Sequence, residues 1–172
     1  MVTYYLIWLG FITVAVSDAR EHRIPNYMLG IILALAIIDK VLSLTPLSSL
    51  MNAALGALIM FLCAFILFLI RAMAPGDVKL LGVVGFVAGW GQLLAISYWI
   101  AVSTVIVALF YAAIRLAEQP KSAKMLLSKY TLLLSGVGAD KKSRFFAEPS
   151  ETKLRMPFAP IVVIGLALHQ YF

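Results

Sequence analysis

The 172-residue chain is 63% hydrophobic and only 13% charged, and its formal net charge is +6. Soluble globular domains are about half apolar and about a quarter charged, so this composition excludes a water-soluble domain and predicts an all-α integral membrane protein. The single cysteine, Cys63, lies within an apolar run, which excludes a disulfide framework and a cysteine-rich metal site.

Six apolar stretches are long enough, or nearly long enough, to cross a bilayer, and we expect each to form a transmembrane helix. Their approximate ranges are residues 2–17, 26–46, 50–70, 78–91, 92–114 and 156–172. The fourth and fifth are one continuous apolar stretch, in which Gly89-Trp90-Gly91 predicts a turn. Residues 1–172 are therefore expected to form one polytopic membrane domain with both termini on the same side.

The basic residues predict the orientation of these spans. Nine Lys and Arg side chains lie in residues 115–155, and Arg20, Arg23, Arg71 and Lys79 flank the two other connections on that side; Lys40 alone lies opposite. The positive-inside rule puts these connections in the cytoplasm and both termini outside it. Residues 2–17 could instead be a cleaved signal peptide, but no basic residue precedes them, so we expect them to remain as the first span.

The longest polar connection, residues 115–155, also carries four of the eight acidic residues. Within it, the spacing of apolar residues over 121–135 predicts a helix at the membrane surface, and a solvated basic loop is the alternative. Because basic segments beside membrane spans attract anionic lipids, we expect lipid rather than nucleic acid as the partner of this segment.

Three aspartates lie at the ends of expected spans, where a carboxylate is costly unless it is paired or functional. Asp18 ends the first span and Asp77 begins the fourth, so both are expected at the cytoplasmic face. Asp39 is expected at the opposite face, where an ion pair with Lys40 would explain it. Two carboxylates that share a proton provide a base to activate water and an acid to protonate a leaving amine, as peptide hydrolysis requires.

The two aspartates alone leave a structural alternative open, because Arg20, Arg23 and Lys79 are close enough in sequence to pair with them. The sequence offers no other catalytic arrangement. His22 and His169 are far apart and lack the spacing of a zinc peptidase, and neither a phosphate-binding loop nor a serine nucleophile motif is present.

Three motifs extend this pattern, and they resemble those of one family. The sequence reads Asp18-Ala-Arg-Glu-His-Arg-Ile24-Pro25-Asn26, then Ala74-Pro75-Gly76-Asp77-Val78-Lys79-Leu80, then Arg155-Met-Pro157-Phe158-Ala159-Pro160. In this order and spacing the motifs resemble the type IV prepilin peptidase family, membrane aspartic proteases with six spans. The short form of the chain looks most like the peptidases of Tad/Flp-type pilus systems.

This resemblance implies that Asp18 and Asp77 are the catalytic pair and that no metal or cofactor takes part. It implies prepilin or pseudopilin substrates, cut between a short basic leader and a hydrophobic helix at the cytoplasmic side of the bacterial inner membrane. The residues expected to shape the site are Ile24, Pro25, Asn26, Ala74, Pro75, Gly76 and Lys79.

Several of these residues also have expected physical roles. Pro25 is expected to start the second span, with Asn26 as its capping side chain. Pro75 is expected to hold the preceding residue extended, and Gly76 to let backbone pass close to the site. Lys79 could stabilise a nearby ionised carboxylate or extend its ammonium group toward water.

The sequence departs from the family pattern in two ways. The first glycine of the family's Gly-x-Gly-Asp motif is Ala74 here, which would cost about 1 kcal/mol or more if that position requires a positive φ. Larger members carry an N-terminal extension with Cys-x-x-Cys motifs and methylate the new N-terminus. This sequence has a single cysteine and therefore no such motif. We expect neither N-methyltransferase activity nor S-adenosylmethionine binding. An inactive family member, a proton-coupled carrier and a scaffold subunit are the alternatives.

Overall fold

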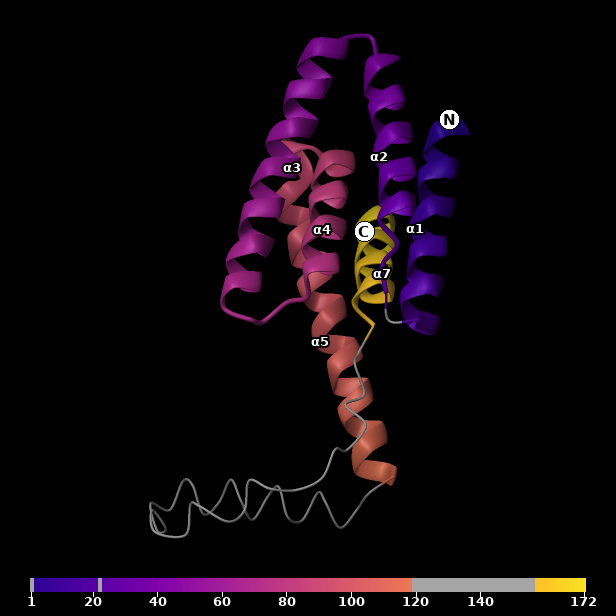
Figure 1. The fold of residues 1–172 in the computed structure, drawn as a ribbon, viewed down its shortest axis with the longest axis vertical. Coiled ribbons are helices and arrows are strands. Elements are labelled where there is room, and N and C mark those ends of the chain that lie inside the picture. The colour runs from indigo at the N-terminus through magenta and orange to yellow at the C-terminus, as the bar shows by residue number, and fades with distance from the viewer. Residues whose placement is uncertain (1, 22, 119–156) are drawn as a thin grey trace. The chain divides into compact units, whose positions relative to one another are not determined.

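Figure 1 shows the computed structural model, which describes residues 2–21, 23–118 and 157–172. All secondary structure in these ranges is helical, as predicted for an all-α protein. The elements are α1 (Val2–Glu21), α2 (Asn26–Val41), α3 (Pro46–Leu69), α4 (Pro75–Ala88), the 3-10 helix η1 (Trp90–Gln92), α5 (Leu93–Glu118) and α7 (Phe158–Tyr171). The surface helix predicted over 121–135 lies outside the described residues.

The chain divides into two compact units. The first consists of Met1–Thr104 and Met156–Phe172, and the second of Val105–Arg155. The first unit therefore contains α1 to α4, η1, the beginning of α5 and α7. In the second unit, the described residues 105–118 form the remainder of α5.

Within the described ranges, three helical segments are long and apolar enough to cross a membrane: Val2–Glu21, Pro46–Leu69 and Trp90–Ile114. The helices α2, α4 and α7 have 16, 14 and 14 residues. At a rise of about 1.5 Å per residue they extend about 21–24 Å, less than the roughly 30 Å of a typical hydrocarbon core. Six membrane crossings therefore remain a prediction.

Within the first unit, α4 is the central helix. It is buried on most sides, and its buried residues are Val78, Leu80, Leu81, Val83, Val84, Gly85 and Phe86. By contrast, α3 exposes about half of each of Leu55, Leu58, Leu62 and Ile66. A helix that is apolar all round is typical of a protein interior, and a large exposed apolar surface is typical of a helix that faces lipid.

Glycine allows α3 and α4 to approach each other closely. A Cβ atom on Gly56 would lie 2.5 Å from the carbonyl oxygen of Gly85, and a Cβ on Gly85 would lie 2.5 Å from that of Gly56. No real Cβ atom tolerates such distances, so both positions require glycine. Small residues bring helix backbones together in the same way inside membranes.

The chain turns between α4 and α5 where the sequence predicted. Gly89 ends α4 with φ 71° and ψ 172°, a conformation that is essentially restricted to glycine. The side-chain oxygen of Asn52 on α3 accepts a hydrogen bond from the Trp90 backbone N–H, with an N···O distance of 3.2 Å. This contact ties the turn to α3.

Proline marks the beginnings of four helices. Pro25 and Pro157 are the N-cap residues of α2 and α7, and α3 and α4 begin at Pro46 and Pro75. Proline suits these positions because it has no N–H to leave unsatisfied and its φ is already helical. The predicted start of the second apolar helix at Pro25 is confirmed.

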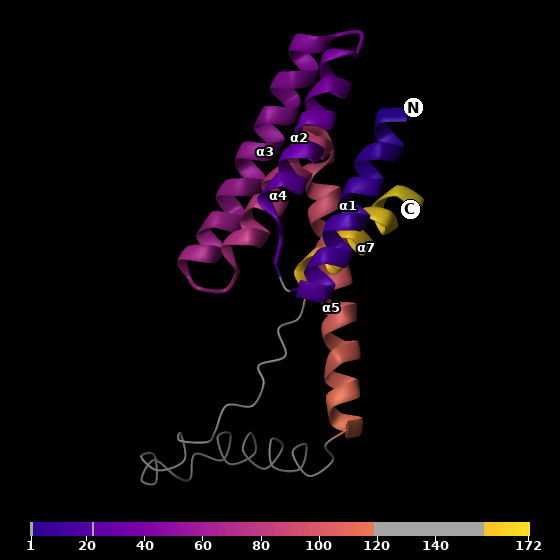
Figure 2. The same cartoon turned by 45° about the vertical axis from the view of Figure 1, so that its right-hand side comes forward.

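The helices of the first unit alternate in direction, and this brings the three motifs to one end. Figures 1 and 2 both show the end of α1 and the beginnings of α2, α4 and α7 at the lower end of the unit. The turn between α2 and α3 and the N-terminal end of α1 lie toward the other end.

Candidate active site

Asp18 lies in the last turn of α1 and is only 6% exposed. Its Oδ2 atom accepts a hydrogen bond from the backbone N–H of Ala159, with an N···O distance of 2.9 Å. Ala159 is the second residue of α7 and is fully buried. The N–H groups of a first helical turn have no partner within their own helix, so Asp18 satisfies one of them from a neighbouring helix. This bond joins the first and third motifs.

Asp77 lies in the first turn of α4 and is half-buried. Its backbone N–H donates to the carbonyl oxygen of Ala74 at 3.1 Å, which helps to form that turn. Asp18 and Asp77 thus belong to helix ends on the same side of the first unit, whereas the sharing of a proton between them stays a prediction.

The first two motifs are in direct contact. The Lys79 Nζ atom donates a hydrogen bond to Asn26 Oδ1 at 3.1 Å, and a Cβ atom on Gly76 would lie 3.6 Å from the Cβ atom of Ile24. The short link that follows α1 therefore packs against the first turn of α4.

The prediction that Asn26 caps its own helix is wrong. The N-cap position of α2 is Pro25, and no side-chain capping hydrogen bond forms there within the described residues. The side-chain oxygen of Asn26 instead accepts the hydrogen bond from the Lys79 ammonium group. A charged donor makes a stronger hydrogen bond than a neutral backbone N–H, which explains the preference.

Ala74 replaces the family glycine without backbone strain. It has φ −80° and ψ 152°, the extended conformation predicted from the proline that follows it. Among the described non-glycine residues, Arg71 alone has a positive φ, at 61°. The cost considered for a positive φ at position 74 therefore does not arise.

The expectation that Gly76 permits a close backbone approach is not supported within the described part of the chain. The nearest atoms to a Cβ placed on it belong to the side chain of Ile24, at 3.6–3.9 Å, which is ordinary van der Waals contact. Here the neighbouring group is a side chain, and it leaves room for a methyl group.

Asp39 has a different partner from the one predicted. Its Oδ1 atom accepts a hydrogen bond from the Thr3 hydroxyl at 2.6 Å, which joins α2 to α1. An ion pair with Lys40 was expected, but consecutive residues of a helix point in directions about 100° apart and do not face each other.

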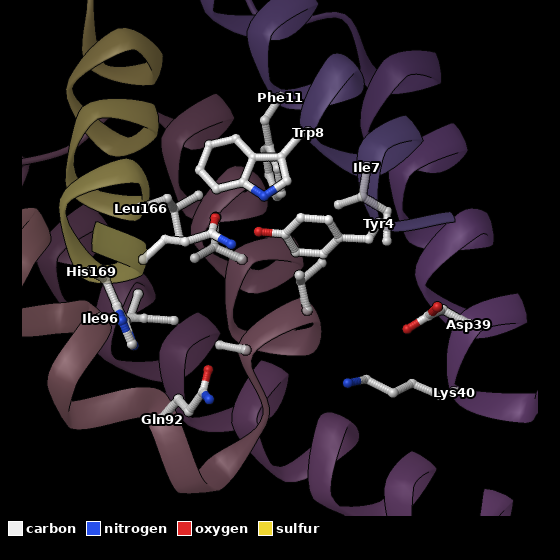
Figure 3. A pocket seen from close by; sticks show the side chains of 14 residues that line it. Tyr4, Ile7, Trp8, Phe11, Asp39, Lys40, Gln92, Ile96, Leu166 and His169 are labelled. Atoms are coloured by element: carbon white, nitrogen blue, oxygen red, sulfur yellow. The ribbon is translucent and has the colours of Figure 1, made fainter. Parts of the chain in front are cut away.

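A cavity of about 460 Å³ lies between α1, α2, α4, α5 and α7 in the first unit (Figure 3). Its lining includes Asp39, Lys40 and His169, whose Nε2 atom is buried without a hydrogen-bond partner among the described residues. Neither Asp18 nor Asp77 lines it. The cavity is therefore separate from the three motifs.

The described ranges contain no group of three or more His, Cys, Asp or Glu residues placed to hold a metal ion. The polar groups in contact around the motifs are a carboxylate, a backbone N–H, an amide and an ammonium group. All four groups can form hydrogen bonds to water, and the carboxylate can also take up and release a proton.

A comparison with protein families identifies the chain. The model described as the type IV leader peptidase family matches residues 3–117, more than half of the sequence. The chain belongs to the type IV leader peptidase family. The family predicted from the three motifs is therefore confirmed, and membership of a peptidase family supports a protease. Neither the curated proteins nor the solved structures gave a match.

The matched range of the type IV leader peptidase family includes Asp18 and Asp77 but ends before α7. A peptidase family and three helices able to cross a membrane together indicate a membrane peptidase. Ala159 belongs to the third motif, but the sequence did not predict that its backbone N–H binds Asp18. The two prolines that flank Phe158 and Ala159 are the only sequence signal for it.

Proposed function

We propose that this protein is an aspartic endopeptidase that removes the short basic leader from prepilin or pseudopilin precursors, with Asp18 and Asp77 as its catalytic pair. The family match over residues 3–117, which includes both aspartates, carries this proposal. The contacts of Asp18 with α7 and of Asn26 with Lys79 support it, since they connect all three motifs at one end of the first unit.

In the proposed reaction, one carboxylate takes a proton from a water molecule that attacks the scissile carbonyl. The other carboxyl group donates a proton to the carbonyl oxygen, and the leaving amine is protonated as the C–N bond breaks. Burial of Asp18 favours this chemistry, because electrostatic interactions are stronger where water is excluded.

We further propose six membrane crossings in the bacterial inner membrane, with both termini outside the cytoplasm and the basic segment 115–155 against anionic lipid. The distribution of the Lys and Arg residues supports this orientation. The substrate helix would lie beside the spans in the bilayer, with its basic leader in the cytoplasm. The resemblance to the Tad/Flp-type peptidases favours pilins of that class as substrates.

The proposal is tested by co-expression with a pilin precursor from the same genome, with cleavage followed as a shift in gel mobility. Wild type is compared with Asp18→Asn, Asp77→Asn and Asp39→Asn. Asparagine keeps a side-chain oxygen that can accept the hydrogen bonds of Ala159 and Thr3, so the folds should be preserved.

We expect cleavage to be abolished by the first two substitutions and retained by the third, because Asp39 bonds to Thr3 away from the motifs. Cleavage by either Asp18→Asn or Asp77→Asn at the wild-type rate would contradict the dyad. A folded wild type that cleaves no precursor but carries a pH-dependent ion flux in vesicles would favour the carrier alternative.

A further inference from the structure

The first turn of α7 offers few hydrogen-bond donors. A helix N-terminus normally presents several free N–H groups, but Pro157 at the N-cap and Pro160 two residues into the helix have none. Only Phe158 and Ala159 keep a backbone N–H between these prolines. One of these two donors is the group that binds Asp18 Oδ2.

The hydrogen bond between Ala159 and Asp18 is closed to solvent. Ala159 is fully buried and Asp18 is 6% exposed, and the neighbouring core residues Val14 on α1 and Val162 on α7 are fully buried as well. Water is therefore poorly placed to replace this bond if it is lost. A hydrogen bond to a charged group contributes more than a neutral one, and its loss leaves a buried carboxylate oxygen unsatisfied.

The geometry also distinguishes the two oxygens of Asp18. Because Oδ2 accepts the N–H of Ala159, Oδ2 is not the atom that carries a proton in this arrangement. Oδ1 is the oxygen left to exchange protons.

We propose that the backbone N–H of Ala159 is a positioning group that holds Asp18 as the general base, with Asp77 as the general acid. This inference rests on the proposed function and assigns the two carboxylates their separate roles. Among the described residues, the charged groups at this end of the first unit include Arg20 and Glu21 on α1, Arg23 in the link, and Asp77 and Lys79 on α4; the first turn of α7 has none.

The proton transfers balance in this assignment. Asp18 Oδ1 takes a proton from water while the water oxygen bonds to the scissile carbon and the Asp77 proton moves to the carbonyl oxygen. The C–N bond then breaks as Asp18 returns its proton to the leaving nitrogen, and one hydroxyl of the intermediate returns a proton to Asp77. Both groups thereby recover their starting states.

The positioning role is tested by removing a single N–H from the full-length protein. Lactic acid incorporated at position 159 by nonsense suppression replaces the N–H with an ester oxygen and keeps the methyl group. The matched control is phenyllactic acid at position 158, which removes the neighbouring donor of the same turn. We expect the ester at 159 to lower kcat about 10- to 100-fold with little change in KM, and the control to stay within about threefold.

Equal losses from both esters would show that the turn is merely structural and would overturn the proposal, as would full activity of the ester at 159. The separation of kcat from KM is the readout that a merely structural role would not give.

A thermal-unfolding cycle in detergent tests the contact itself, independently of cleavage. It compares wild type, Asp18→Ala, the ester at 159 and the combination of the two. We expect the ester to lower Tm in the wild-type background and to have much less effect with Asp18→Ala, because the two changes remove the same bond. Equal Tm losses in both backgrounds would overturn the contact. If the ester and Asp18→Ala are coupled in Tm but the protein cleaves no precursor, the contact stands, and the proposed function and the catalytic role are overturned.

Discussion

Lys79, the fifth residue of α4, donates a hydrogen bond from Nζ to Oδ1 of Asn26, the first residue of α2, at 3.1 Å. The two residues are 53 positions apart in the sequence. Asn26 follows Asp18 closely in the sequence, and Lys79 follows Asp77. Their contact therefore fixes the beginnings of α2 and α4 relative to each other. The link that contains Ile24 and Pro25 is thereby held against α4.

Loss of this contact should reduce cleavage more than stability. Both side chains are exposed, so we expect Asn26→Ala and Lys79→Met each to lower the free energy of unfolding by less than about 1 kcal/mol. We expect each to lower kcat/KM for a pilin precursor about tenfold, since small displacements of catalytic groups are costly. The double variant should lose no more than either single variant, and additive losses would contradict a shared role. Lys40→Met, near the other end of α2, is the matched control.

Ala74→Gly should not raise activity. The backbone at Ala74 is extended, with φ −80°, so glycine relieves no strain there and adds freedom to the unfolded chain. We expect unchanged or slightly lower kcat and a loss of about 0.5–1 kcal/mol in the free energy of unfolding. A large gain in kcat would show that the family glycine serves a purpose other than backbone conformation.

Arg71→Gly should stabilise the protein. Arg71 ends α3 in the left-handed conformation, with its N–H bonded to Phe68 O and the Ala72 N–H bonded to Leu67 O, both at 2.9 Å. This is a Schellman motif, in which glycine usually occupies the left-handed position. We expect the free energy of unfolding, measured by chemical denaturation in mixed micelles, to rise by about 1 kcal/mol. Arg71→Ala keeps a Cβ atom in the left-handed conformation and should therefore show no such gain. Equal gains in both variants would show that the loss of the Arg71 charge, and not the backbone conformation, stabilises the protein.

The close crossing of α3 and α4 should be sensitive to a single methyl group. We expect Gly85→Ala to destabilise the fold by about 2 kcal/mol or more, because its Cβ would meet the backbone of Gly56. Gly30→Ala on α2 is the control, since a Cβ there meets nothing within 4 Å. Alanine is a better helix former, so Gly30→Ala should be neutral or stabilising by up to about 1 kcal/mol. Similar losses in both variants would contradict the crossing.

Much of the helical order could be predicted from local features of the sequence. Apolar runs predicted the helices, Pro25 predicted the start of α2, and Gly89 predicted the turn between α4 and α5. Each of these signals acts through the geometry of the residue itself or of its neighbours. The fourth helix begins earlier than predicted, at Pro75 rather than near residue 78. The second helix ends earlier than predicted, at Val41, because the apolar run continues into a turn.

The partners of the site residues could not be predicted in the same way. Asn26 was assigned to its own helix because the sequence does not reveal a lysine that approaches from 53 positions away. The donor to Asp18 is a backbone N–H, which every residue except proline carries, so its identity depends on the packing of α7 against α1. Thr3 and Asp39 are likewise joined only by the pairing of α1 with α2.

The bond between Ala159 and Asp18 has a consequence for how the protein can be divided. The segment that carries the family match ends at residue 117, and it includes both aspartates but not α7. A fragment cut at that point would leave the buried Ser103 hydroxyl without its bond to the Ile161 carbonyl oxygen and the Asp18 carboxylate without its donor. The recognisable part of the chain is thus smaller than the part that must fold together, and the last helix belongs in any minimal version of this protein.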